Sequence, residues 1–165
     1  MVRLQDKVAI VSGGAQGLGE GIARRLAEEG ASVVIADING VKAKSVADGL
    51  TQEGKHAIAV TLDVAERKQV REAIQKTVDR FGRLDVMFNN AGFNKPLPFM
   101  DVDEDNFNSI MRVNAFGVLV GTQEAARQMM AQGSGARSST PPRSRDDRAM
   151  RNSLPIARAR PPLSR

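Results

Sequence analysis

The sequence predicts an α/β fold in which helices cover both faces of a doubly wound parallel sheet. Short runs rich in Val and Ile alternate along the chain with longer segments whose apolar residues recur at helical spacing. Such runs are typical of strands buried on both faces, and their alternation with helices favours a parallel sheet. A glycine-rich stretch directly after the first run indicates a tight turn from strand to helix.

Four parallel strands are expected, one for each apolar run. They are placed at residues 7–12, 32–37, 56–63 and 84–90. The intervening segments predict helices, because apolar residues three or four positions apart share one helix face. These positions are Leu18, Ile22 and Leu26, then Val41, Val46 and Leu50, then Val70, Ile74 and Val78.

Two further helices are expected at residues 101–111 and 113–130. Acidic residues crowd the start of the first, where the helix dipole favours them. The second is apolar over much of its surface, at Val118, Leu119, Val120, Met129 and Met130. Burial in the core is the favoured explanation, and a contact between subunits is the alternative.

The chain changes character near residue 135, so a folded domain at 1–135 and a tail at 136–165 are expected. The tail carries eight Arg against Asp146 and Asp147, and it holds five of the seven prolines. This composition predicts disorder. The remaining residues have 16 basic and 17 acidic side chains, a net charge of −1, so the positive charge of the chain belongs to the tail, which is +6.

Several classes of protein are disfavoured by composition. The chain has no Cys, so neither a disulfide framework nor a thiolate metal site is expected. It shows no amino-terminal apolar signal and no apolar run of roughly 20 residues, so a cytoplasmic location and no membrane partner are predicted. A nucleic-acid partner is the weakest hypothesis, because no aromatic residue interrupts the arginines of the tail to stack on bases.

The stretch from Ser12 to Gly19 (SGGAQGLG) is the first candidate binding site. Glycines let the backbone turn tightly and approach a pyrophosphate, whose charge the amide groups at the start of the next helix can meet. Glycines also occur in plain turns. The position between a strand and a helix is what favours a dinucleotide site here.

Asp37 is the second candidate, since it ends the second apolar run, 18 residues beyond Gly19. A carboxylate there can accept both hydroxyls of an adenosine ribose and would repel a 2′-phosphate. NAD is therefore predicted rather than NADP. The alternative is that Asp37 only caps the following helix.

Further motifs continue this pattern, and together they resemble the classical short-chain dehydrogenase/reductase family over residues 4–135. The motifs are Gly-x-x-x-Gly-x-Gly at Gly13, Gly17 and Gly19, then Asp63-Val64, then Asn89-Asn90-Ala91-Gly92, and Asn114. The spacing is similar to that of bacterial acetoin/butanediol and polyol dehydrogenases. Ser12 stands where the family usually has Thr, which keeps the hydroxyl.

The resemblance implies a Rossmann-type domain that binds NAD, acts on a small-molecule alcohol or ketone and forms a homo-oligomer, either a dimer or a tetramer. It implies that Asn114 is part of the catalytic machinery and holds the water of a proton relay. The residues implied to bind the cofactor are Ser12, Gly13, Gln16, Gly17, Leu18, Gly19, Asp37, Ile38, Asp63, Val64, Asn90, Ala91, Gly92 and Val113.

The family's proton-transfer residues are absent from this sequence. In the family a Tyr moves the hydroxyl proton, a Lys four residues later lowers its pKa, and a Ser thirteen residues earlier polarises the substrate oxygen. This chain has no Tyr, and its last Lys is Lys95. The sheet is accordingly expected to be incomplete, with about four strands.

A shifted reading frame is the hypothesis that explains this absence. If each original codon takes the third base of one present codon and the first two of the next, residues 137–141 permit Lys-Ile-Ile-Asn-Thr, which resembles the family's fifth strand. Arg143, Ile156 and Arg160 then permit Ser, Tyr and Lys, at the family spacing of 13 and four. The alternative to a shifted frame is a genuine basic tail on a divergent member of the family. The alternative function is that of a catalytically inactive dinucleotide-binding fragment.

Overall fold

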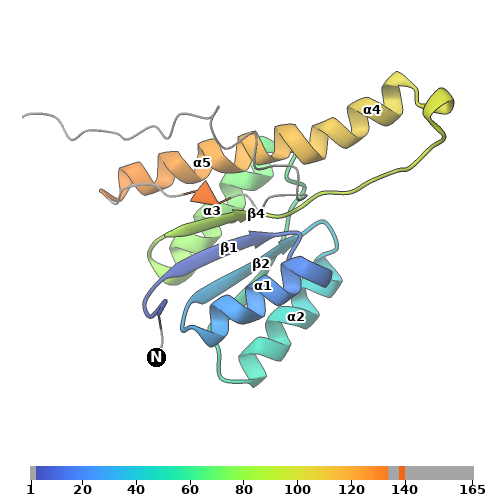
Figure 1. Cartoon of the computed structure of the whole chain (residues 1–165). Helices are drawn as coiled ribbons and strands as arrows, with labels where there is room; N and C mark the ends of the chain where they lie inside the picture. The colour runs from blue at the N-terminus through green and yellow to red at the C-terminus, as the bar shows by residue number, and fades with distance from the viewer. Residues whose placement is uncertain (1–2, 134–137, 140–165) are drawn as a thin grey trace, which may run out of the picture.

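The structure is a computed structural model that describes residues 3–133 and 138–139 (Figure 1). Its one sheet has the strand order β3-β2-β1-β4-β5, and all neighbouring strands are parallel. The strands are β1 (Val8–Ser12), β2 (Ser32–Asp37), β3 (Ala57–Thr61), β4 (Val86–Asn89) and β5 (Ser138–Ser139). The helices are α1 (Gly17–Glu28), α2 (Gly40–Gln52), α3 (Arg67–Phe81), α4 (Glu104–Met111) and α5 (Val118–Ala131), with a 3-10 turn η1 (Phe99–Asp101) and a π-helical segment η2 (Arg112–Gly117).

Helices cover both faces of the sheet, which gives three layers (Figure 1). Alternate residues of each strand point to opposite faces. Val11 and Ile35 therefore pack in the cluster beneath α1 and α2, while Ile10 and Val34 pack in the cluster beneath α3 and α5. Both clusters are almost fully buried, which explains why the strands are apolar without interruption.

Local signals set where the helices begin and end. Asn39 caps α2, since its side chain accepts a hydrogen bond from the Lys42 amide at 3.0 Å. The helix α3 ends at Gly82, whose φ of 80° is left-handed and favours glycine. The turn at Gly82 then returns the chain to the sheet at β4.

The four predicted parallel strands are confirmed as β1 to β4. A fifth, two-residue strand is added by Ser138 and Ser139, which pair with Met87 and Phe88 of β4. The expectation of a disordered tail at 136–165 stays a prediction. The other residues of that tail lie outside the part of the chain that the structure describes.

The helices expected at 101–111 and 113–130 form one long rod rather than two separate helices. The segment η2 joins α4 directly to α5, as the yellow-to-orange rod in Figure 1 shows. Burial along it is one-sided: Val120 and Met129 are buried, but Leu119 and Met130 are 50% and 55% exposed. Core burial, the favoured explanation, does not hold for Leu119 and Met130, and the alternative of a subunit contact stays a prediction.

Candidate functional site

A cavity of about 630 Å³ lies at the carboxyl ends of β1 and β4. Between these strands the order of the sheet reverses, and open α/β sheets bind ligands at such a reversal. Its lining residues are Gly13, Gln16, Gly17, Leu18, Gly19, Asp37, Ile38, Leu62, Asp63, Val64, Asn90, Ala91, Gly92, Phe93 and Val113.

The glycine stretch forms the floor of this cavity and depends on having no side chains. Gly13 and Gly17 have φ values of 65° and 56°, which residues with a Cβ rarely adopt. A Cβ at Gly19 would lie 2.0 Å from the carbonyl oxygen of Gly13. The start of α1 is therefore in direct contact with the loop, and this cradle excludes any larger residue.

The amino terminus of α1 opens into the cavity. Its N-cap residue Gln16 makes no side-chain capping hydrogen bond. The first amide groups of a helix have no partners inside the helix and carry a partial positive charge. This end of the cavity therefore suits a phosphate group.

Ser12 and Asn90 hold the glycine loop against the end of β4. The hydroxyl of Ser12 donates to the Phe88 carbonyl at 3.3 Å and accepts from the amides of Asn90 and Ala91 at 3.1 Å each. The Asn90 side chain donates to the carbonyls of Ser12 and Gly13 at 3.2 Å. Ser12 is buried and does not line the cavity, so its contribution is to position the loop.

Asp37 stands where β2 ends and faces the glycine loop. Its Oδ2 accepts a hydrogen bond from the Ala15 amide at 3.1 Å, and its Oδ1 accepts from the Asn39 amide at 2.9 Å. Asn39, not Asp37, caps α2. A carboxylate has about four acceptor positions, so each oxygen retains one for a ligand hydroxyl.

The opposite wall is built from Asp63, Val64 and the rod. Asp63 Oδ1 accepts from the Ala65 amide at 2.9 Å, which turns the chain out of β3. Val64 is buried against η2, where a Cβ on Gly117 would lie 2.6 Å from Val64 Cγ2. The small residue at 117 thus lets the rod approach this wall.

Asn114 does not line the cavity but fixes a residue that does. Its Oδ1 accepts from the Phe93 amide at 3.0 Å, and its Nδ2 donates to the Phe93 carbonyl at 2.9 Å. Asn114 lies in the π-helical segment, a kind of distortion that often occurs at functional sites. The side chain therefore ties the segment after β4 to the rod.

The structure brings together all the residues expected to bind the cofactor except Ser12, which lies directly behind them. Sequence reasoning missed Leu62 and Phe93. Each is a direct neighbour of a motif, since Leu62 precedes Asp63-Val64 and Phe93 follows Gly92. An apolar residue adjoining a binding motif was the available signal.

No group of three or more His, Cys, Asp or Glu that could hold a metal ion occurs within residues 3–133 and 138–139. Across the same residues, none of the helices has the length and apolar character needed to cross a membrane. His56, the single histidine, is exposed and lies outside the cavity.

Comparison with known proteins agrees with the fold. A family model described as short chain dehydrogenase matches residues 7–136. Diacetyl reductase [(S)-acetoin forming] of Staphylococcus epidermidis is 40% identical over 127 residues, which are 77% of this chain and 49% of that protein. 3beta-hydroxysteroid dehydrogenase 2 of Eggerthella lenta is 35% identical over 80% of this chain and 51% of its own length. The chain thus spans about half the length of these curated relatives.

Solved structures show the same likeness. A short-chain type dehydrogenase/reductase from Mycobacterium marinum superposes with a TM-score of 0.81 at 31% identity, covering 84% of this chain and 56% of that one. A gluconate 5-dehydrogenase from Burkholderia cenocepacia, in complex with NADP and tartrate, has a TM-score of 0.77 at 38% identity, covering 84% and 54%. Sequence motifs, sheet order and these matches together lead to one conclusion: the chain belongs to the short-chain dehydrogenase family.

Proposed function

We propose that this chain is the cofactor-binding part of an NAD-dependent oxidoreductase that transfers a hydride between a secondary alcohol or ketone and nicotinamide. The observation that carries the proposal is the cavity itself. An uncapped helix terminus lies at one end of it, and the carboxylate of Asp37 faces the glycine loop. These groups complement the pyrophosphate and the adenosine ribose of a dinucleotide.

NAD is preferred over NADP in this proposal because of the charge on Asp37. The extra phosphate of NADP would lie beside that carboxylate in a partly buried place. The positive charge of Lys42 acts against this preference, because it would attract the extra phosphate. Its Nζ lies on the rim of the cavity, where it donates to Gln16 Oε1 at 3.0 Å. Lys42 itself does not line the cavity, whereas Asp37 does, so the repulsion is expected to win.

When bound, nicotinamide would accept or supply the hydride, and the protein would have to move the hydroxyl proton. The residues of this chain position the walls of the cavity: Ser12 and Asn90 fix the glycine loop, and Asn114 fixes Phe93. The chain has no Tyr and no Lys after Lys95 to transfer the proton. We therefore propose that the 165-residue chain binds cofactor without turnover.

A reading-frame shift near codon 136 is proposed as the cause. The family match ends at residue 136, where the composition also changes. Resequencing the gene tests the idea, and it fails if adding or removing bases there does not open a frame encoding Tyr-x-x-x-Lys.

Cofactor binding is tested with the 165-residue chain itself, by titrating NADH and NADPH and following nicotinamide fluorescence. NADH should bind more tightly, and secondary alcohols with NAD should give no NADH above background. Failure of both cofactors to bind would remove the proposed function. Alcohol-dependent NADH production would show that another residue moves the proton.

For the intact protein we further propose a homo-oligomer in the cytoplasm. The half-exposed Leu119 and Met130 on the outer face of α5 support a subunit contact there. Sedimentation of the frame-restored protein tests this. If resequencing confirms the present reading frame, the alternative function applies to this chain: an inactive dinucleotide-binding fragment.

A further inference from the structure

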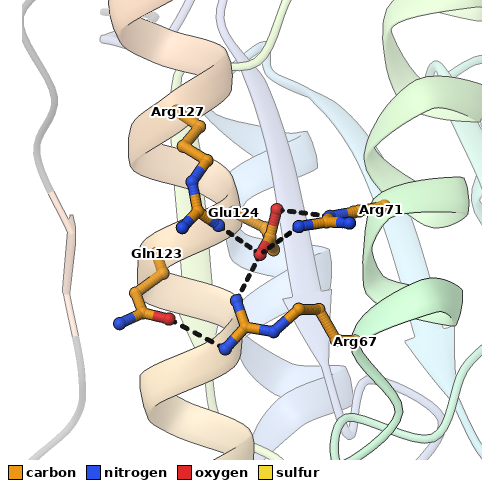
Figure 2. Close-up of polar contacts among 5 residues, drawn as sticks. All are labelled: Arg67, Arg71, Gln123, Glu124 and Arg127. Carbon is orange, nitrogen blue, oxygen red and sulfur yellow. Dashed lines mark hydrogen bonds and ion pairs between the residues drawn. The ribbon is translucent and has the colours of Figure 1, made fainter.

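A second charged site lies away from the cofactor cavity, in the seam between α3 and α5. Glu124 of α5 has a side chain only 4% exposed, and three guanidinium groups surround it (Figure 2). Arg71 contributes Nε at 2.9 Å from Glu124 Oε2, while Arg67 and Arg127 each donate to Oε1. The three arginines come from two helices that are otherwise joined mainly by apolar packing.

The cluster carries more positive charge than its carboxylate can balance. Arg67 divides its donors between Glu124 and Gln123 Oε1, the latter at 2.9 Å, so it lies on one side of the carboxylate (Figure 2). Arg71 and Arg127 approach from other directions (Figure 2). One negative charge against three positive charges leaves a local excess of two, and a single guanidinium would have sufficed to pair Glu124.

Arg71 and Arg127 border a hollow of about 300 Å³ on this surface. The remainder of its lining is Ile74, Gln75, Glu124 and Gln128. Each guanidinium has five N–H donors, and the hydrogen bonds to Glu124 and Gln123 use only a minority of those that the three arginines carry. Glu124 meanwhile restricts the arginines to one arrangement, so less side-chain entropy would be lost on binding an anion.

We propose that this hollow binds a phosphate group through Arg71 and Arg127, with Glu124 as the buried residue that positions both. Arg71 and Arg127 are the two arginines that line the hollow, against the single carboxylate of Glu124. The tetrahedral oxygens of a phosphate accept forked hydrogen bonds from guanidinium groups. The site is separate from the cofactor cavity, with which it shares no lining residue. The proposal therefore does not depend on whether NAD binds in the cofactor cavity.

Inorganic phosphate is the probe, titrated into the full 165-residue chain at constant ionic strength while the arginine Nε–Hε NMR signals are followed. The signals of Arg71 and Arg127 should move together and saturate, and chloride at the same ionic strength should not reproduce this. Succinate serves as a carboxylate dianion and should bind more weakly. Movement confined to amides of the glycine loop would mean that phosphate binds only there, which overturns the proposal.

Two variants test the assignment. Arg71→Gln and Arg127→Gln should each weaken phosphate binding by about tenfold, the effect of losing a charge-assisted hydrogen bond. Lys68→Gln is the matched control, because it removes one positive charge from α3 outside the hollow, where Lys68 pairs with Glu72 at 3.9 Å. If a Gln variant fails to fold by circular dichroism, Arg127→Lys keeps the charge and should still lose most of the forked binding. Equal weakening in the control, or none in the arginine variants, would overturn the proposal.

Discussion

Replacing Glu124 by Gln is expected to loosen α5 from α3 in a pH-dependent way. Burial alone would raise the pKa of Glu124, but hydrogen bonds from Arg71, Arg67 and Arg127 outweigh it and lower the pKa to about 2. Against an ordinary value of 4.5, this corresponds to about 3 kcal/mol in favour of the charged, folded form. The variant loses that contribution and leaves three guanidinium groups around a neutral amide.

The pH dependence of this stabilisation follows from the direction in which the pKa of Glu124 is shifted. The pKa is lower in the folded state, so the stabilisation is fully present above about pH 5 and disappears as pH falls toward 2. At pH 7, Glu124→Gln should lower the free energy of unfolding by about 3 kcal/mol, and at pH 3 by only about 1 kcal/mol.

Urea unfolding followed by far-ultraviolet circular dichroism at both pH values measures this difference. With an m-value of about 1.5 kcal/mol per M, the midpoint should fall by about 2 M at pH 7. Glu72→Gln is the matched control, because this half-exposed α3 carboxylate should contribute less than about 1 kcal/mol. An equal loss at pH 7 and pH 3, or no loss at pH 7, would refute the argument that the charged form clamps the two helices.

The remaining predictions concern the cofactor cavity. Asp37→Ala should narrow the preference for NADH over NADPH by at least about tenfold, because it removes the charge that repels a 2′-phosphate. Fluorescence titration measures the two affinities, and Asp48→Ala, on the exposed side of α2, should leave the preference unchanged. Gly19→Ala should abolish binding of both cofactors, because the new Cβ would lie 2.0 Å from the Gly13 carbonyl oxygen, and retained affinity would contradict the cradle geometry. Asn114→Ala should leave NADH affinity within about threefold but speed hydrogen exchange at the Phe93 amide, which loses its acceptor.

The sheet and the cavity were predictable because both follow from local pattern. Uninterrupted apolar runs predicted β1 to β4, and the turn from β1 into α1 placed the glycines at the edge of the sheet. The carboxyl ends of parallel strands share one edge, so motifs following β1, β2, β3 and β4 had to meet there. The sequence therefore predicted which residues meet at the site more accurately than it predicted where the helices begin and end.

What could not be predicted depends on contacts between distant segments. The pattern of the rod did not show that Leu119 and Met130 would face outward, because a broad apolar surface fits either burial or exposure to a subunit. The Glu124 cluster was equally invisible, since Arg67 and Glu124 are 57 positions apart in the chain. Only the packing of α3 against α5 brings those charges together.

The strand order has a consequence for how this chain folds as it is synthesised. The first strand made, β1, lies in the middle of the sheet, where Val8 pairs with Ser32 and Ala9 with Val86. One edge of β1 therefore finds its partner early, while the other stays open until β4 emerges from the ribosome. At a synthesis rate of about 5–20 residues per second, that wait lasts several seconds. During this interval Val8 to Ser12 form an apolar edge exposed to other chains, so a slow codon or a ribosome stall before β4 would favour aggregation.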